Sequence, residues 1–376
     1  MRLGDEAGEP HVSSLLQGAF GVVLFILIIG VLVLVHELGH FFAARRAGVR
    51  VHEFGIGFPP RARVLRSDGE TVYTLNWLPI GGFVKLEGED GDSDDERSFG
   101  RASFVTRQLI LVAGVVMNLV LAFVIMLIVA WLPQQAIGIQ IGSVQSGSPA
   151  AAAGLTAGMR LVSIDGRQYD RIDGPIAIVE DLRAQAGQEV TLGLQDVNGA
   201  PVTVTTTLRT PAEISADKGA LGVAELKTVV LDETFIRTPM EALATAGSRT
   251  VAAFRLILDG LGQLGSSIVS HPTQPPPVAG PVGIAEQVTV IFWQAGPVAT
   301  LYVAGLLSAN LALVNILPFP PLDGGRMLMI LIKAIAGARV SVRAEQATYL
   351  VGFAVLFAFL IWVTVFDVAR LAGGGQ

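Results

Sequence analysis

The sequence has no cysteine and only five histidines among its 376 residues. Without thiolates the chain forms neither a disulfide framework nor a cysteine zinc site, so any metal must be bound through His, Asp, Glu or water. Charged residues are also scarce, at 15% of the total, and the net charge of −6 offers no basic patch for nucleic acid. A disulfide-rich secreted domain and a nucleic-acid-binding protein are therefore excluded.

Hydrophobic residues make up 51% of the chain. This share is high for a soluble protein, yet the charged share is high for a chain that only spans a bilayer, so the composition indicates a membrane protein with one water-facing domain. The first 17 residues contain three acidic residues but only one arginine. Because a secretory leader is basic at this position, we expect no cleaved signal peptide.

Four apolar segments are long enough to cross a bilayer, which takes about 20 helical residues. Lys and Arg are dense after the first segment: residues 45–107 carry ten in 63 positions, whereas residues 133–296 carry ten in 164. By the positive-inside rule, residues 45–107 face the cytoplasm, and both termini and the large domain face outward. The predicted spans are residues 18–44, 108–132, 297–316 and 347–367.

The first span ends in the motif His36-Glu37-Leu38-Gly39-His40. Residues four apart lie on one face of a helix, so both imidazoles can bind one ion while Glu37 reaches a water beside it. This spacing is typical of zinc hydrolases, and a metal-binding group inside hydrocarbon indicates a functional site. We therefore expect Zn²⁺ as the cofactor, His36 and His40 as ligands, and Glu37 as the catalytic acid/base.

A catalytic zinc site keeps three protein ligands and one open position, so a third ligand is required. Asp323 follows three prolines that end the third span, and two glycines come directly after it. A carboxylate at membrane depth needs a partner, which favours Asp323. The competing third ligands are His52, Glu53 and Asp367.

Residues 72–79 and 81–86 predict two short strands about a Pro/Gly turn. A hairpin placed just after an intramembrane helix can dip into the bilayer edge and offer one free strand edge to an extended peptide. The alternative is a cytoplasmic surface hairpin. In the second span, Asn118 is interpreted as a helix-packing contact, and a site residue is the alternative.

From Ala136 onward, short alternating segments predict a small β-rich domain, whose strand–helix groove would bind extended peptides or chain ends. A spacer that only excludes bulky substrates is the alternative. Apolar residues three and four apart in 239–270 predict a helix on the membrane surface, and His271 after it is interpreted as a loop residue. The predicted domain elements are strands at 139–144, 161–164, 190–194 and 202–208, and helices at 150–153 and 176–186.

The HELGH motif, together with residues 315–325, resembles the site-2 protease family of intramembrane zinc metalloproteases. With a single PDZ-like insert, the chain is similar to the bacterial branch that cleaves membrane-anchored anti-sigma factors. The resemblance covers nearly the whole chain, including 142–166 for the PDZ pattern and 278–284 before the third span. It implies a membrane-reentrant hairpin at 72–86. It also implies zinc ligands His36, His40 and Asp323, the catalytic residue Glu37, and substrate-binding residues Asn310, Asn315, Pro318 and Pro320.

Three features depart from the pattern of this family. The chain has room for one PDZ domain where some members have two in tandem. Residues 158–161 lack the Gly-Asp of many PDZ repeats of this type, and residues 113–118 lack the proline that often follows the glycine in the second span. None of these departures affects a predicted zinc ligand.

The predicted fold class is a polytopic α-helical membrane protein with four transmembrane helices, a membrane-reentrant β-hairpin and one inserted PDZ-like β-rich domain. The predicted segments are 1–48 with the first span, 49–107 with the hairpin and a cytoplasmic loop, 108–132 as the second span, 133–212 as the PDZ-like domain, 213–296 as a connector with the interfacial helix, 297–325 as the third span, 326–346 as a cytoplasmic loop, and 347–376 with the fourth span.

The predicted function is hydrolysis of a peptide bond within or near the transmembrane helix of a single-span substrate, such as an anti-sigma factor, in a bacterial inner membrane. Expected partners are that substrate, the lipid bilayer and a peptide or chain end at the PDZ groove. A membrane-anchored PDZ adaptor with a structural or vestigial zinc site is one alternative. A metal or proton transporter is another, but it would need further acidic residues within the spans.

Overall fold

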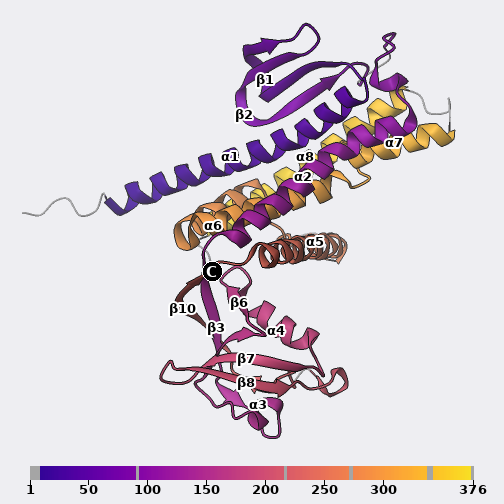
Figure 1. Cartoon of the computed structure of the whole chain (residues 1–376). Coiled ribbons are helices and arrows are strands. Elements are labelled where there is room, and N and C mark those ends of the chain that lie inside the picture. Colours follow the sequence, from indigo (N-terminus) through magenta and orange to yellow (C-terminus); the bar gives the residue numbers. More distant parts are fainter. Residues whose placement is uncertain (1–8, 90–92, 216–217, 271–273, 337–341, 374–376) are drawn as a thin grey trace, which may run out of the picture. The chain divides into compact units, whose positions relative to one another are not determined.

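The computed structural model describes residues 9–89, 93–215, 218–270, 274–336 and 342–373, and His271 lies outside them. The chain forms two compact units (Figure 1). The first contains Met1–Val129 and Leu243–Gln376, and the second contains Ala130–Ala242.

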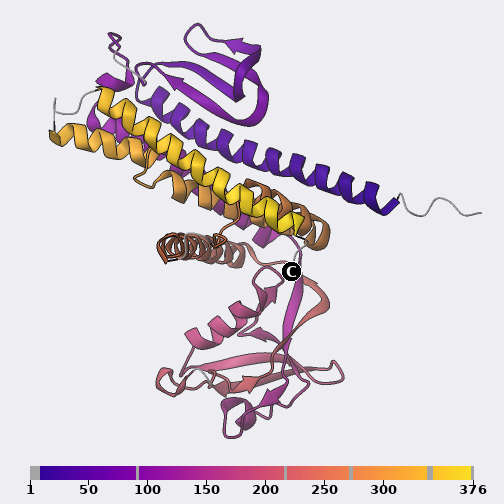
Figure 2. The same cartoon turned by 180° about the vertical axis from the view of Figure 1, so that it is seen from behind.

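Four long helices of the first unit contain windows that are long and apolar enough to cross a membrane. They correspond to the four predicted spans, and Figures 1 and 2 show α2, α6 and α8 running side by side. Their bounds are α1 Glu9–Arg46, α2 Phe104–Trp131, α6 Pro281–Asn315 and α8 Val342–Ala372. The protein is therefore an integral membrane protein.

Helix α6 is longer than the predicted third span because it consists of two helical halves that meet at a kink. Gly296 has a φ of +82°, outside the helical region, and Pro297 follows it inside the helix. The predicted span 297–316 corresponds to the second half of α6. The first half, which the sequence places in a connector, packs on α1, where the rings of Phe20 and Phe292 lie 4.9 Å apart.

The beginning of α6 is fixed by a carboxylate of α8. The side chain of Asp367 is buried and accepts hydrogen bonds from the backbone N–H groups of Gly280, at 3.2 Å, and Gly283, at 2.8 Å. The free N–H groups at a helix N-terminus favour a negative charge, so this contact stabilises the packing of α8 on α6.

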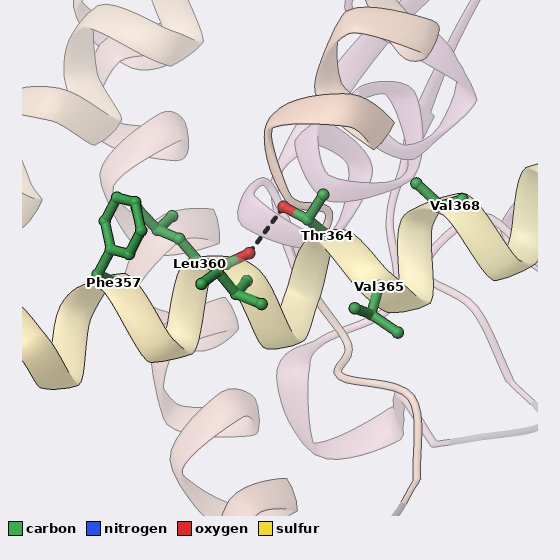
Figure 3. Close-up of a pocket in the computed structure, with 6 residues that line it drawn as sticks. Phe357, Leu360, Thr364, Val365 and Val368 are labelled. Carbon is green, nitrogen blue, oxygen red and sulfur yellow. Dashed lines mark hydrogen bonds between the residues drawn. The ribbon is translucent and has the colours of Figure 1, made fainter.

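The residues that line a pocket along α8 are apolar apart from Thr364 (Figure 3). The Thr364 hydroxyl donates to the Leu360 carbonyl one turn earlier, at 2.7 Å, so the polar group among these lining residues is satisfied within the helix. A surface of this kind suits contact with lipid. A shallow depression of about 420 Å³ there is lined by Phe357, Leu360, Ile361, Thr364, Val365 and Val368.

Strands β1 (Val51–Ser67) and β2 (Val72–Leu86) form a sheet packed against α1. Both strands are bent: residues 53–56 of β1 pair with 72–75 and also with 82–85, while the end of β1 pairs with the start of β2. The sequence predicts a hairpin inside 72–86, but that stretch is one strand whose partner is β1. The glycines and prolines of β1 favour turns, which is why its strand is missed.

The turn between β1 and β2 is built on Asp68. Its Oδ1 accepts the backbone N–H groups of Thr71, at 2.7 Å, and Glu70, at 3.1 Å. These two bonds hold the pKa of Asp68 below its ordinary value, Thr71 having the larger effect. The turn is therefore fixed by an ionised side chain.

Among the described residues, α7 (Asp323–Ala336) and nearly all of α5 (Pro239–Ser270) also belong to the first unit. Helix α7 occupies residues that the sequence assigns to the third span and a loop. Helix α5 matches the predicted amphipathic helix 239–270, and its Ala253 packs with Ala122 of α2 and Ala309 of α6. Its place on the membrane surface stays a prediction. A 3-10 turn, η1, covers Phe99–Arg101.

The second unit is built on a six-stranded sheet in the order β10-β3-β6-β5-β7-β8, beside a two-stranded sheet of β4 and β9. The strands are β3 Gln134–Gln140, β4 Ser143–Val144, β5 Arg160–Ile164, β6 Arg167–Asp170, β7 Glu189–Gln195, β8 Pro201–Thr207, β9 Val223–Ala224 and β10 Lys227–Phe235, and the helical elements are α3 Pro149–Ala152, α4 Gly174–Ala184 and η2 Pro211–Glu213.

Each predicted strand and helix of this unit overlaps an observed element, but the predicted strand 139–144 is divided between β3 and β4, which lie in different sheets, and the unit continues past residue 212. Strand β10 pairs antiparallel with β3, so the unit extends to Ala242. Ile178 and Leu182 of α4 belong to the same buried core as the sheet residues. The buried Tyr169 hydroxyl donates to Asp181 of α4 at 2.5 Å; burial, and then Asp181, raise the pKa of this phenol, which therefore stays neutral.

Candidate metal centre

His36 and His40 lie one turn apart on α1, and both are buried. The two Nε2 atoms are 3.1 Å apart, and the rings are nearly perpendicular, at 87°. The predicted helix face is therefore present, and the two imidazoles point at one position.

Asp323 reaches this position from the first residue of α7. Its Oδ2 lies 2.9 Å from His36 Nε2 and 3.3 Å from His40 Nε2. Helix α6 ends at Asn315, and the chain turns through the prolines before α7 begins. Gly324 is required in this turn, because a Cβ there would lie 2.2 Å from the carbonyl oxygen of Ile316.

Two nitrogens and one carboxylate oxygen within 3.3 Å of one another fit the donor set of a zinc ion. Tetrahedral zinc, with bonds of about 2.0–2.1 Å, holds neighbouring ligand atoms about 3.3–3.4 Å apart. The three atoms are thus close to the spacing that zinc needs. The residues His36, His40 and Asp323 would hold the ion.

Glu37 also lies beside the two imidazoles, with ligand atoms of all three residues within 4.8 Å of one another. Its Oε2, however, accepts the backbone N–H of Val84 in β2 at 3.1 Å. Asp323 contacts both imidazoles more closely and is the better third ligand. Glu37 is left adjacent to the site, held by the edge of the sheet.

The competing third ligands are engaged elsewhere among the described residues. His52 pairs with Glu87, and Glu53 accepts from Arg61 at 2.6 Å. Asp367 binds the amides at the beginning of α6. The structure therefore brings only Asp323, of the four candidates, to both histidines.

Comparison with known proteins gives the family of this chain. The model of Peptidase family M50 matches residues 24–359. The chain belongs to peptidase family M50. It is 32% identical over 351 residues to a Clostridium acetobutylicum protein named "Putative zinc metalloprotease", a match covering 93% of this chain and 97% of that protein. It is 27% identical over 429 residues to Zinc metalloprotease RasP of Geobacillus kaustophilus, covering 93% and 98%.

Membership in this family makes the chain a zinc metalloprotease of the site-2 protease type, with Zn²⁺ as its cofactor. The predicted family, enzyme class and cofactor are confirmed. The roles of the individual residues rest on the geometry described above and remain predictions.

Asn310 and Asn315 of this M50 peptidase lie in the last turns of α6, half-buried. Neither side-chain amide makes a hydrogen bond within the part of the chain that the structure describes. Pro318 is exposed and Pro320 is half-buried, both in the turn that leads to Asp323. Their predicted contacts with substrate are proposals, and the free amides are consistent with them.

Helix α2 of the M50 peptidase contributes a support that the sequence does not reveal. The Nδ1–H of His40 donates to the backbone carbonyl of Ile110 at 2.8 Å. Four residues later, Gly114 lets the helix approach both rings: a Cβ there would lie 2.5 Å from His40 Nε2 and 2.8 Å from His36 Cε1. An outer partner of this kind fixes the orientation of a metal ligand.

Gly114→Ala is expected to lower both zinc affinity and thermal stability. The added methyl group overlaps the imidazoles, and overpacking of this kind costs about 1–3 kcal/mol. Zinc per purified chain and the unfolding temperature measure the two effects. Gly260→Ala, in α5, is the matched control because nothing lies within 4 Å of its added Cβ. Wild-type behaviour of Gly114→Ala would contradict the close packing of α2 on the rings.

Proposed function

We propose that this M50 peptidase hydrolyses a peptide bond within or near the transmembrane helix of a single-span membrane protein. The observation that carries the proposal is the convergence of His36, His40 and Asp323, whose donor atoms lie within 3.3 Å inside a unit of four apolar helices. A hydrolytic site among such helices is suited to substrates that lie in the membrane.

The chemistry divides between the cofactor and the chain. When bound, zinc supplies Lewis-acid chemistry, which acidifies a water and polarises a carbonyl. Glu37 takes the proton from the attacking water and returns it to the leaving amine, since its carboxylate lies beside both ligand histidines. Asn315 donates a hydrogen bond from its amide to the developing oxyanion.

The sheet of β1 and β2 is the proposed membrane-reentrant element. Its outward side chains are unusually apolar for a surface sheet, with Trp77 71% exposed. Burial of these side chains at the bilayer edge removes them from water. The exposed large apolar residues of this sheet include Ile56, Phe58, Leu75, Trp77, Leu78 and Ile80.

The same sheet is suited to hold an unwound substrate. Residues 82–85 pair with β1, and Val84 also contacts Glu37, so this part of β2 runs beside the proposed catalytic residue. A substrate helix hides its peptide groups in internal hydrogen bonds, so it must unwind before cleavage. Pairing with a strand edge, together with the amides of Asn310 and Asn315, replaces the lost hydrogen bonds.

The second unit is the proposed PDZ-like domain. Its antiparallel sheet and packed helix α4 follow the predicted order of strands and helices. The predicted groove between a strand and a helix of this domain would bind a peptide or chain end by strand addition. Because Lys and Arg are dense in residues 45–107, we propose that this unit and both termini lie on the side away from the cytoplasm, and that the membrane is a bacterial inner membrane. Anti-sigma factors are the proposed class of single-span substrate.

The test is cleavage of a single-span model substrate by the purified full-length chain in detergent, with product masses measured. The proposal predicts a cut within or next to the substrate helix, loss of the cut in excess chelator, and recovery when Zn²⁺ is added back. A membrane-anchored adaptor would bind the same substrate without cutting it. Stable binding without cleavage by zinc-loaded protein would therefore refute the proposal.

A further inference from the structure

Asn118 lies on α2 directly beside one of the proposed zinc ligands. Its side chain is 0% exposed, and its Nδ2 lies 3.3 Å from Nδ1 of His36. The sequence favours a simple packing role, but the amide contacts an imidazole and not only an apolar neighbour. We infer that Asn118 is a positioning residue that orients His36 for zinc binding, an inference that rests on the proposed function.

The tautomer of His36 explains why an acceptor is needed at this point. Zinc binds a neutral imidazole through one nitrogen, and the other nitrogen then carries the proton. The Nε2 of His36 faces Asp323, at 2.9 Å, and His40, at 3.1 Å. Nδ1 must therefore carry the proton and donate it to a hydrogen-bond acceptor.

The Asn118 amide provides that acceptor. Its Oδ1 has no hydrogen-bond partner among the described residues. A half-turn about the Cβ–Cγ bond moves Oδ1 to the position of Nδ2, 3.3 Å from His36 Nδ1. Either orientation leaves one amide atom without a partner. Zinc polarises the imidazole of His36, which strengthens the hydrogen bond that its Nδ1–H donates, because charge-assisted hydrogen bonds are roughly twice as strong as neutral ones. This stronger bond favours the amide orientation in which Oδ1 faces His36.

The second imidazole is supported in the same way by the same helix. His40 Nδ1 donates to the carbonyl of Ile110 at 2.8 Å. Ile110, Gly114 and Asn118 are spaced by four and share one face of α2. This face supplies one acceptor for each imidazole, and Gly114 between them leaves room for both rings. Both ligands are thus held with Nε2 directed at the ion.

A neighbouring hydrogen bond supplies a matched control. The Ser308 hydroxyl of α6 donates to the backbone carbonyl of Asn118 at 2.8 Å, and Ser308 is also fully buried. Ser308→Ala therefore removes a buried hydrogen bond to the same residue but leaves the side-chain amide in place. If Asn118 had only a packing role, substitutions at Asn118 and at Ser308 would change zinc affinity to the same extent.

The experiment measures the dissociation constant for Zn²⁺ of the full-length chain in detergent, by competition with a chelator. Asn118→Leu and Asn118→Ala are expected to raise this constant about 10–100-fold, the usual effect of losing an outer partner of a metal ligand. Asn118→Asp is expected to stay near the wild-type value, because a carboxylate accepts the same hydrogen bond. Ser308→Ala is also expected to stay near it.

Wild-type zinc affinity in both Asn118→Leu and Asn118→Ala would overturn the inference. An equal loss in Asn118→Asp, or in Ser308→Ala, would also overturn it, because packing would then explain the effect. Failure of the proposed function gives a different result: the zinc-loaded wild-type chain would leave the single-span substrate uncut, while the Asn118 variants would still lose zinc affinity. The affinity is read without substrate, so it does not depend on cleavage.

Discussion

Glu37→Gln is expected to lower the rate of substrate cleavage by about 10²–10⁴-fold, the range that general acid–base catalysis contributes. The amide has nearly the shape of the carboxylate but cannot take a proton from water or return it to the leaving amine. Zinc content should stay at the wild-type level, because Glu37 is held by Val84 while Asp323 contacts both histidines. Single-turnover cleavage and zinc per chain measure the two quantities.

Glu286→Gln is the control for this variant, since Glu286 is an exposed carboxylate of α6. It removes one acidic group from the same membrane unit and should cleave at the wild-type rate. Full activity in Glu37→Gln would remove Glu37 from the mechanism. Loss of zinc from this variant would instead make Glu37 a ligand and would displace Asp323 from that role.

Asp323→Ala is expected to have the largest effect on zinc binding. One of three protein ligands is lost, so the affinity should fall by more than the about 10–100-fold that loss of an outer partner causes. Cleavage should be lost with the metal. Asp323 also begins α7, so the unfolding temperature is recorded to separate loss of metal from loss of fold.

His52→Ala is the matched control for a ligand candidate that the structure places elsewhere. His52 pairs with Glu87, and its side chain is 42% exposed. Wild-type zinc affinity is expected. If Asp323→Ala kept its zinc while His52→Ala lost it, the third ligand would be His52, and the proposed convergence of α1 and α7 would be wrong.

The sequence predicted the four spans because their signals are local; the metal ligands remain a prediction, and the structure brings their side chains together. A run of about 20 apolar residues defines a transmembrane helix without knowledge of its neighbours. His36 and His40 share a helix, so their spacing alone brings them together. Asp323 was predicted to join the two histidines because a catalytic zinc site requires a third protein ligand. The structure shows that its carboxylate contacts both imidazoles.

The parts that the sequence did not predict depend on contacts between distant segments. Strand β1 has a turn-like composition and becomes a strand because β2 pairs with it. Strand β10 joins the sheet of the second unit through β3, so the unit extends past its predicted end. The roles of Gly114 and Asn118 depend on how closely α2 approaches α1, which no spacing in α2 reveals.

The contact between His36 and Asp323 joins residues that are 287 positions apart. At a synthesis rate of about 5–20 residues per second, the chain grows for roughly 15–60 s between the first ligand and the last. Throughout that interval the nascent chain holds an incomplete ligand set. With Asp323 as the proposed third ligand, proteolytic competence begins only after the segment that contains it has been synthesised and inserted.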